Sequence, residues 1–149
     1  MEKQPRTQLP AGRIPTLRLE PMPCDTNQHG DIFGGWVMSQ VDLAGGEAAM
    51  RYALTQKVVT RAVSSFTFEH PIKVGDIVSL YADIVKVGNT SLTVKVDVYA
   101  EHITRKRNLV DLVTEAELVY VCLGPDDKPL PVKESRRLYF AAHPEDTEA

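Results

Sequence analysis

The sequence has few cysteines, little excess charge and no long hydrophobic run. The two cysteines, Cys24 and Cys122, form no CxxC pair, and free thiols in a reducing compartment are expected rather than a disulfide. The net charge of -3 gives no general attraction to nucleic acid. No apolar run approaches the roughly 18 residues of a membrane helix, and the first ten residues lack the apolar segment of a signal peptide. We therefore expect a cytoplasmic protein that neither inserts into membranes nor binds nucleic acid.

Proline is almost absent from the middle of the chain. Nine of the ten prolines lie before residue 24 or after residue 124, and only Pro71 lies between them. Because proline interrupts helices and central strands, the prolines mark the ends of a folded unit. We predict a flexible N-terminal tail at 1–15, one domain at 16–123 and a Pro-rich, charged C-terminal tail at 124–149. A chain of 149 residues is long enough for one domain with a substantial core.

Alternating apolar and polar residues dominate the second half of the sequence. Leu92, Val94, Val96 and Val98 alternate with polar side chains, which is the period of a strand with one buried face. Similar patterns precede and follow this segment, and Gly88-Asn89 supplies a tight turn. The predicted strands are 16–22, 57–70, 76–87, 89–103 and 111–123.

One segment has the period of a helix, from about residue 34 to residue 54. Its apolar residues cover most of the helical circumference, which indicates a buried helix. A single buried helix with five mainly antiparallel strands predicts an α+β fold, in which a curved sheet wraps around the helix. The expected order of elements is β-α-β-β-β-β.

Asp42 interrupts the apolar pattern of this helix. No cation lies three or four residues away from it, where Met38, Ser39, Gly45 and Gly46 stand. An unpaired buried carboxylate costs several kcal/mol. Asp42 is therefore either a structural residue, bonded to a loop amide or a distant arginine, or a base that faces a ligand. The adjacent glycines favour the second interpretation, because glycines within a helix are destabilising and commonly mark a close approach by backbone or ligand.

The start of the helix carries a second pair of glycines. Gly34 and Gly35 occupy the first turn, where backbone N–H groups have no acceptor within the helix. These donors and the positive end of the helix dipole can stabilise an oxyanion. Glycines before a helix are also simple turn formers, but together with Asp42 two turns later they suggest a hydrolytic site.

The segment PCDTNQHGDIFGGWVMSQVD, residues 23–42, resembles the beginning of hotdog-fold acyl-CoA thioesterases, namely the YciA-type enzymes and the brain acyl-CoA hydrolases. The segment FTFEHPIKVGDIV resembles a second stretch of that family, and the resemblance covers residues 16–123. The matching positions are Pro23, Asp25, Asn27, Gly30, Gly34, Gly35, Asp42, Phe68, Pro71, Gly75 and Asp76.

The resemblance implies a hotdog fold and an enzyme that hydrolyses fatty acyl-CoA to free acid and CoA without a metal or an organic cofactor. It also implies that two subunits share one continuous sheet with active sites at their interface, within a hexamer formed as a trimer of dimers. Asp42 would then be the general base, Asn27 its partner on the facing subunit, and the Gly35 N–H would polarise the thioester carbonyl. The expected substrate-binding residues are His29, Gly34, Arg61, Ser64, Ser65, Gly88, Thr90, Ser91, Arg105 and Arg107.

The sequence departs from the family on one predicted strand. Members often have an arginine followed by an acid where this chain has Ala62, Val63 and Ser64. Arg61, or the basic turn 105–107, would have to supply the positive charge for the CoA phosphates.

Three other functions are compatible with parts of the sequence. A hotdog-fold dehydratase would use His29 and Asp42 to add or remove water at an acyl thioester double bond. A non-catalytic acyl-CoA sensor would need a DNA-binding segment, for which neither tail offers a helix-turn-helix. A Cys24–His29 nucleophile would need an orienting third group, and the sequence shows none.

Overall fold

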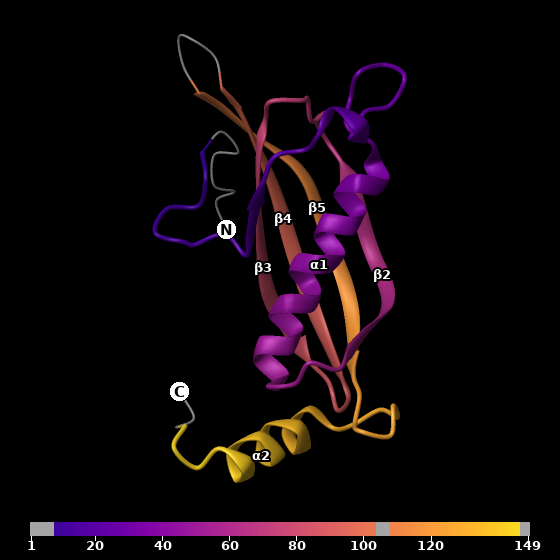
Figure 1. Cartoon of the computed structure of the whole chain (residues 1–149), viewed down its shortest axis with the longest axis vertical. Helices are drawn as coiled ribbons and strands as arrows, with labels where there is room; N and C mark the ends of the chain where they lie inside the picture. Colours follow the sequence, from indigo (N-terminus) through magenta and orange to yellow (C-terminus); the bar gives the residue numbers. More distant parts are fainter. Residues whose placement is uncertain (1–7, 104–107, 147–149) are drawn as a thin grey trace.

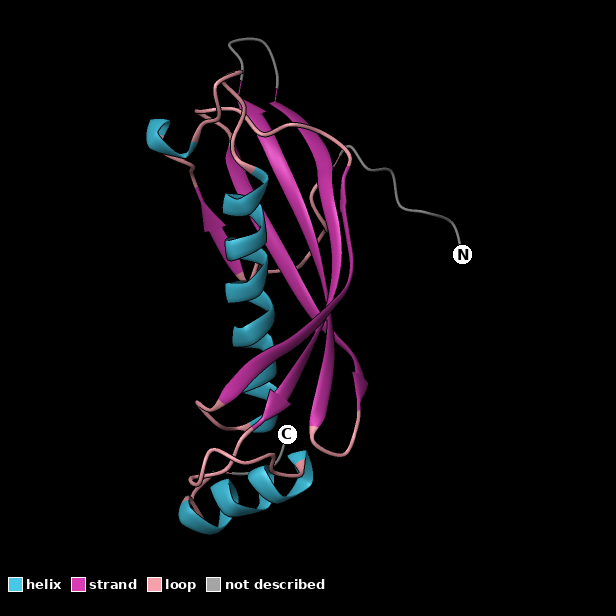
Figure 2. Ribbon diagram, turned by 90° about the vertical axis from the view of Figure 1, so that its right-hand side faces the viewer, coloured by secondary structure: helices cyan, strands magenta, loops and turns pink. Residues whose placement is uncertain are grey.

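The protein is a curved sheet with one long helix packed along one of its faces, and a second helix lies beyond the end of the first (Figures 1 and 2). The computed structural model describes residues 8–103 and 108–146. The five strands are antiparallel in the order β1-β3-β4-β5-β2. The elements are β1 (Leu17–Leu19), the short 3-10 helix η1 (Pro23–Asp25), α1 (Gly34–Ala53), β2 (Val58–Phe68), β3 (Ile77–Val87), β4 (Ser91–Ile103), β5 (Asn108–Cys122) and α2 (Val132–Ala142).

The central strand β4 forms the floor of the core, as its alternating sequence predicts. Val94, Val96 and Val98 are fully buried on the face that α1 covers, while the residues between them are only partly buried. Antiparallel pairing of β4 with β3 and β5 places further apolar side chains beside them. The α+β fold class and the order of elements are therefore confirmed.

Helix α1 agrees with the predicted 34–54 to within one residue, but the prediction that it is buried nearly all round is wrong for the single chain. Val37, Val41 and Ala44 face the sheet and are buried. Met38 and Leu43 remain exposed, because the sheet covers only one side of the helix. The apolar residues of α1 thus leave an uncovered stripe on its outer side.

The C-terminal segment contains a helix that the sequence analysis did not predict. Helix α2 begins after Pro131 and rests against the end of α1, where Ser135 Oγ donates to the Ala53 carbonyl at 2.7 Å. Val132, at the start of α2, is buried. Proline just before a helix is a common start signal, but the cluster of prolines in this region pointed to an extended tail instead.

Neither α1 nor α2 has the length and apolar character needed to cross a membrane.

Candidate functional site

Asp42 lies on α1 where the helix faces β2 and β5, and two hydroxyl groups bind its side chain. Thr60 Oγ1 of β2 donates to Asp42 Oδ1 at 2.6 Å. The Tyr120 hydroxyl of β5 lies 3.1 Å from the same oxygen and 2.9 Å from the Asp42 carbonyl oxygen, and its single proton serves both. Within the described residues, no ion pair includes Asp42. The carboxylate is therefore oriented by neutral donors and keeps its charge uncompensated.

Asp42 is an exposed residue in the single chain. The expectation of a buried carboxylate is therefore wrong for the single chain, because solvent reaches it, whereas the expected lack of a cationic partner holds among the described residues. Its exposure follows from the position of β2 at the end of the sheet, beyond which no further strand covers α1. An exposed, oriented carboxylate can accept a proton from a water molecule.

Tyr120 explains the paired glycines of α1. Its ring packs directly on Gly45, where a Cβ atom would collide with the hydroxyl oxygen, and a Cβ at Gly46 would lie 3.7 Å from the ring. The close approach expected at these glycines is thus made by a side chain of β5. Burial raises the pKa of the Tyr120 phenol well above its usual value, and the negative charge of Asp42 adds to this effect. Tyr120 consequently remains a protonated donor.

Asn27 closes a tight loop just before α1, and we call residues 26–33 the Asn27 loop. Asn27 Oδ1 accepts the backbone N–H groups of His29 at 2.9 Å and Asp31 at 3.1 Å. The Asn27 N–H donates to the Asp31 carbonyl at 2.7 Å, and Gly30 takes a positive φ of 84° between them. Since the amide oxygen is used within the loop, only the side-chain NH₂ group remains to bind a ligand.

The first turn of α1 presents free backbone donors, as the sequence predicts. Within the described residues, the N–H groups of Gly34 and Gly35 have no backbone acceptor. Both glycines are exposed, and a Cβ at Gly35 would meet no atom within 4 Å. The Gly35 N–H can therefore be approached by the carbonyl oxygen of a ligand.

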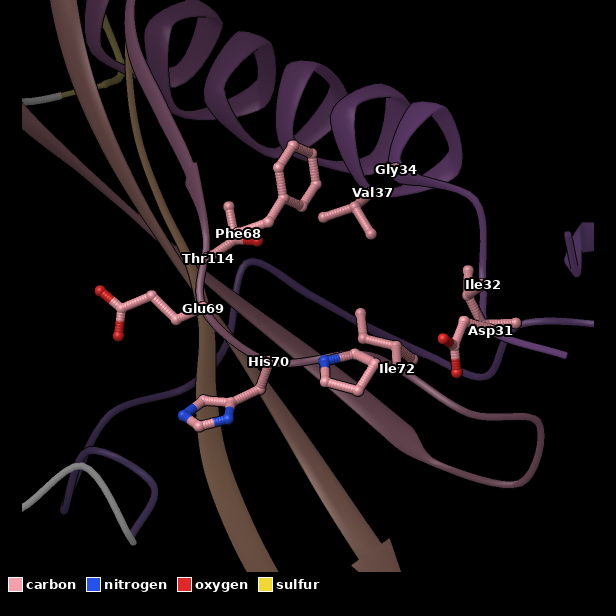
Figure 3. A pocket seen from close by; sticks show the side chains of 10 residues that line it. Asp31, Ile32, Gly34, Val37, Phe68, Glu69, His70, Ile72 and Thr114 are labelled. Carbon is pink, nitrogen blue, oxygen red and sulfur yellow. The ribbon is translucent and has the colours of Figure 1, made fainter. Parts of the chain in front are cut away.

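A cavity of about 360 Å³ lies beside this first turn (Figure 3). The Phe68 ring projects from the end of β2 toward α1 and forms one wall, close to Gly34. Ile32, Val37 and Ile72 form an apolar part of the lining, and Asp31, Glu69, His70 and Thr114 make the rest polar, with Pro71 between them. The apolar part of this hollow, next to free N–H donors, can take an apolar group attached to a polar carbonyl.

The two halves of the candidate site are separated along one helix. Gly35 and Asp42 are seven residues apart in α1, which corresponds to a rise of about 10 Å. A base that activates water and a donor that holds the attacked carbonyl oxygen must both lie within a few ångströms of one carbonyl carbon. Gly35 and Asp42 of the same chain are therefore too far apart to act on one thioester.

Three expected substrate-binding residues lie on β2. Arg61, Ser64 and Ser65 are all exposed. The pairing register of β2 with β5 shifts between Thr60 and Ala62 and again between Val63 and Ser65. Arg61 and Ser64 fall at these two irregularities, and bulges of this kind commonly redirect side chains next to active sites.

The remaining expected binding residues are not gathered around Asp42. Gly88, Thr90 and Ser91 form the β3–β4 turn, which lies beside the start of α2, because the Val132 N–H donates to the Asn89 carbonyl at 2.8 Å. Within one chain, this turn and the Asn27 loop lie at opposite ends of the sheet (Figure 1). Arg105 and Arg107 fall outside the described residues.

Within one chain, His29 does not form the pair with Asp42 that a dehydratase would use. His29 is exposed in the Asn27 loop, before the start of α1, whereas Asp42 lies two turns into the helix. No hydrogen bond joins the two side chains in the described structure.

The sequence analysis missed Thr60 and Tyr120. Thr60 stands in a strand without special features, and Tyr120 fits the alternating core pattern of β5. Only Gly45 and Gly46 signalled that a bulky group approaches α1, and they did not indicate which one.

Comparisons with known proteins identify the family of this chain. The family model of the thioesterase superfamily matches residues 29–106. The acyl-CoA thioester hydrolase YciA of Salmonella typhimurium is 42% identical over 124 residues, which cover 83% of this chain and 92% of the relative. YciA of Escherichia coli is 41% identical over 128 residues, 84% of this chain and 96% of the relative.

Solved structures give the same result. A hexameric hotdog fold thioesterase of Campylobacter jejuni aligns with a TM-score of 0.76 and 40% identity, covering 84% of this chain and 95% of that one. HI0827, a hexameric broad specificity acyl-coenzyme A thioesterase, aligns with a TM-score of 0.75 and 34% identity, covering 89% of this chain and 93% of that one. The protein therefore has the hotdog fold, and the chain belongs to the thioesterase superfamily.

Proposed function

We propose that the protein hydrolyses acyl-CoA thioesters to a free acid and CoA. The observation that carries this proposal is the Asp42 carboxylate, which is exposed, held by the Thr60 and Tyr120 hydroxyls and paired with no cation among residues 8–103 and 108–146. The free N–H donors at the start of α1 and the names of the similar proteins support the same reaction.

Asp42 is the general base of the proposed reaction. It accepts a proton from water while the water oxygen forms a bond to the thioester carbon. The carbonyl oxygen becomes an oxyanion, which the Gly35 N–H and the positive end of α1 stabilise. When the tetrahedral intermediate collapses, its carbon–sulfur bond breaks, and the proton on Asp42 passes to the leaving CoA sulfur.

The site is shared between two subunits in this proposal. Because Gly35 and Asp42 of one helix are about 10 Å apart, Gly35 and Asn27 of one chain work with the partner's Asp42. The Asn27 NH₂ group, left free by the loop, then binds the substrate or the attacking water. The uncovered edge of β2 offers the surface through which two chains form a continuous sheet. The similar hexameric thioesterases support a trimer of such dimers.

The CoA phosphates need positive charge, and two places can supply it. Arg61 stands at an irregular point of β2, close in sequence to Thr60. The basic turn at Arg105 and Arg107 is the other candidate, since arginine side chains suit phosphate oxygens. Replacing each set with alanine should raise KM for acyl-CoA at the true phosphate site. Turnover of a short acyl-pantetheine thioester, which lacks the nucleotide, should change little.

The proposed chemistry uses no metal or organic cofactor, because a carboxylate alone can activate water. Turnover should therefore survive exhaustive chelation, and a loss of activity that zinc or magnesium reverses would contradict this.

We also propose a cytoplasmic location, since Cys24 and Cys122 are free thiols, as in proteins of reducing compartments.

The experiment that tests the function is thiol release from a panel of acyl-CoA substrates, from acetyl to palmitoyl. Release with at least one chain length supports the proposal, and the profile identifies the preferred chain. Loss of the double-bond absorbance of enoyl-CoA without thiol release would instead identify a hydratase.

A further inference from the structure

A series of charged side chains connects the sheet to the Asn27 loop. Asp111 on β5 contacts His102 on β4, His102 contacts Asp76, the Lys73 N–H binds Asp76, and the Lys73 ammonium pairs with Asp31 in the loop. Acidic side chains alternate with basic ones from one end of the series to the other. The proposed reaction leaves all five of these residues without a role, and their order leads to the loop that carries Asn27.

Asp76 is the buried centre of the series. It is 5% exposed, and both of its carboxylate oxygens have donors: Oδ2 accepts the Lys73 N–H at 2.8 Å, and Oδ1 lies 2.8 Å from His102 Nδ1. The other ring nitrogen, His102 Nε2, lies 3.0 Å from Asp111 Oδ2. Both ring nitrogens of His102 thus lie at hydrogen-bond distance from a carboxylate, Asp76 on one side and Asp111 on the other. The turn at residues 73–76 is therefore fixed to β4 and β5.

Lys73 connects this fixed turn to the Asn27 loop. Its ammonium group pairs with Asp31 Oδ1, and the backbones of Asp31 and Lys73 form an isolated antiparallel bridge. Beside it, the Ile32 N–H donates to the Ile72 carbonyl at 2.9 Å. Asp31 is also the residue whose N–H and carbonyl both bind Asn27. A displacement of Asp31 would thus move the Asn27 amide directly.

We propose that Asp31, Lys73, Asp76, His102 and Asp111 form a positioning network for Asn27, with Lys73 as the residue that holds the loop to the sheet. The proposal rests on the role of Asn27 in the proposed hydrolysis. The Lys73 and Asp31 side chains are 53% and 32% exposed, so their ion pair contributes little to global stability. Its effect is on the geometry of the loop, where a displacement of about 1 Å can reduce turnover 100-fold.

Replacing Lys73 with methionine tests the network, because methionine keeps the length of the side chain and removes its charge. We expect kcat to fall between about 10- and 100-fold, with KM for acyl-CoA changed less than about threefold. Tm should stay within about 3 °C of the wild type. Amide hydrogen exchange at His29 and Asp31, whose N–H groups bind Asn27 Oδ1, should become at least about tenfold faster.

Two further variants separate positioning from a general structural role. K73R keeps the charge and should restore both turnover and slow exchange. The matched control is Arg13→Met. It removes the ion pair between Arg13 and Asp83, which is about as exposed as the Lys73–Asp31 pair and lies away from the Asn27 loop. Wild-type exchange in K73M together with a kcat no lower than in Arg13→Met would overturn the proposal, as would a failure of K73R to restore kcat.

Asn27→Asp distinguishes this proposal from the proposed function itself. Aspartate keeps an oxygen acceptor for the His29 and Asp31 N–H groups but lacks the NH₂ donor. Wild-type turnover of Asn27→Asp would contradict the catalytic role of Asn27, and hydrogen exchange in K73M would still decide whether Lys73 holds the loop. A large loss of turnover in Asn27→Asp, together with wild-type exchange in K73M and a kcat no lower than in Arg13→Met, would overturn the network alone.

Discussion

Strands β4 and β2 have similar β-forming sequences and opposite surroundings. In β4, every second residue from Leu92 to Ala100 is buried against α1. In β2, only Val58 and Phe66 are partly buried, and Val59, Val63 and Phe68 are 45%, 47% and 53% exposed. Both strands are rich in the β-branched and aromatic residues that sheets favour. The difference lies in position, since β4 has two neighbouring strands and β2 has one.

The comparison assigns the two strands different roles. Burial on β4 stabilises the fold of the chain itself. An eleven-residue edge strand with exposed apolar side chains is a site for pairing with another chain, and natural proteins rarely leave such an edge open. Thr60, which binds Asp42, lies on this strand. The candidate site is therefore located where a second subunit would join the sheet.

The largest effect is expected at the carboxylate beside β2. Asp42→Asn keeps an oxygen that can accept from Thr60 and Tyr120 but removes the base. We expect kcat for acyl-CoA to fall by about 10² to 10⁴. Because Asp42 is exposed, thermal stability should change little. Near-wild-type thiol release, or an unfolded variant, would show that Asp42 is a structural residue.

A charge on the β2 edge should disrupt assembly and activity together. Val63→Lys places an ammonium group on this edge, where lysine opposes pairing between strands. We expect a smaller particle in sedimentation and a loss of turnover of about tenfold or more. Val85→Lys on β3 is the matched control, because Val85 is similarly exposed at 52%. If Val63→Lys and Val85→Lys had equal effects on assembly and turnover, β2 would not be a special edge for pairing between chains.

Mixing two inactive variants tests whether the site is shared. In a dimer of one Asn27→Ala chain and one Asp42→Ala chain, one site has both substitutions and the other has neither. Random exchange of subunits should therefore restore about one quarter of the wild-type activity per dimer. If the subunits exchange, as labelled chains would report, and activity does not return, then each site lies within one chain.

A substitution on the buried strand β4 should instead lower the free energy of unfolding. Val96→Ala on β4 removes two buried methyl groups, and we expect it to lower the free energy of unfolding by about 2 kcal/mol. Val85→Ala at an exposed position should change it by less than about 0.5 kcal/mol. Chemical denaturation of both variants measures the two changes in unfolding free energy. Equal changes would show that β4 is not the core of the fold.

The smallest effect concerns Tyr120, where the core meets the site. Tyr120→Phe removes one hydrogen bond and should cost about 1 kcal/mol. In the wild type the pKa of Tyr120 is raised above its usual 10.0. The folded state then keeps a proton that the unfolded chain loses, so the stability from this group is complete below pH 10 and declines above it, by at most about 1.4 kcal/mol per pH unit. Tm should therefore fall less steeply between pH 10 and 11 in the phenylalanine variant, and parallel curves would contradict this.

The sequence predicted most of the fold and pointed to Asp42 and the first turn of α1 as the candidate site. Periodicity identified α1 and the strands, because side chains that share a buried face repeat every 3.6 or 2 residues. The charge pattern around Asp42 and the paired glycines marked the helix as unusual. Periodicity does not say which strand lies against which helix, so Thr60 and Tyr120 were missed. The exposure of Asp42 was missed for the same reason, since it depends on β2 being the last strand of the sheet.

The contact of the Tyr120 ring with Gly45 restricts how this protein can change during evolution. Any side chain at position 45 would collide with the phenol, so a substitution there is tolerated only after Tyr120 has become smaller. That change removes a donor to the Asp42 carboxylate. The two positions are 75 residues apart in sequence, yet we expect them to change together, because the collision opposes a first change at Gly45 and the lost donor opposes a first change at Tyr120.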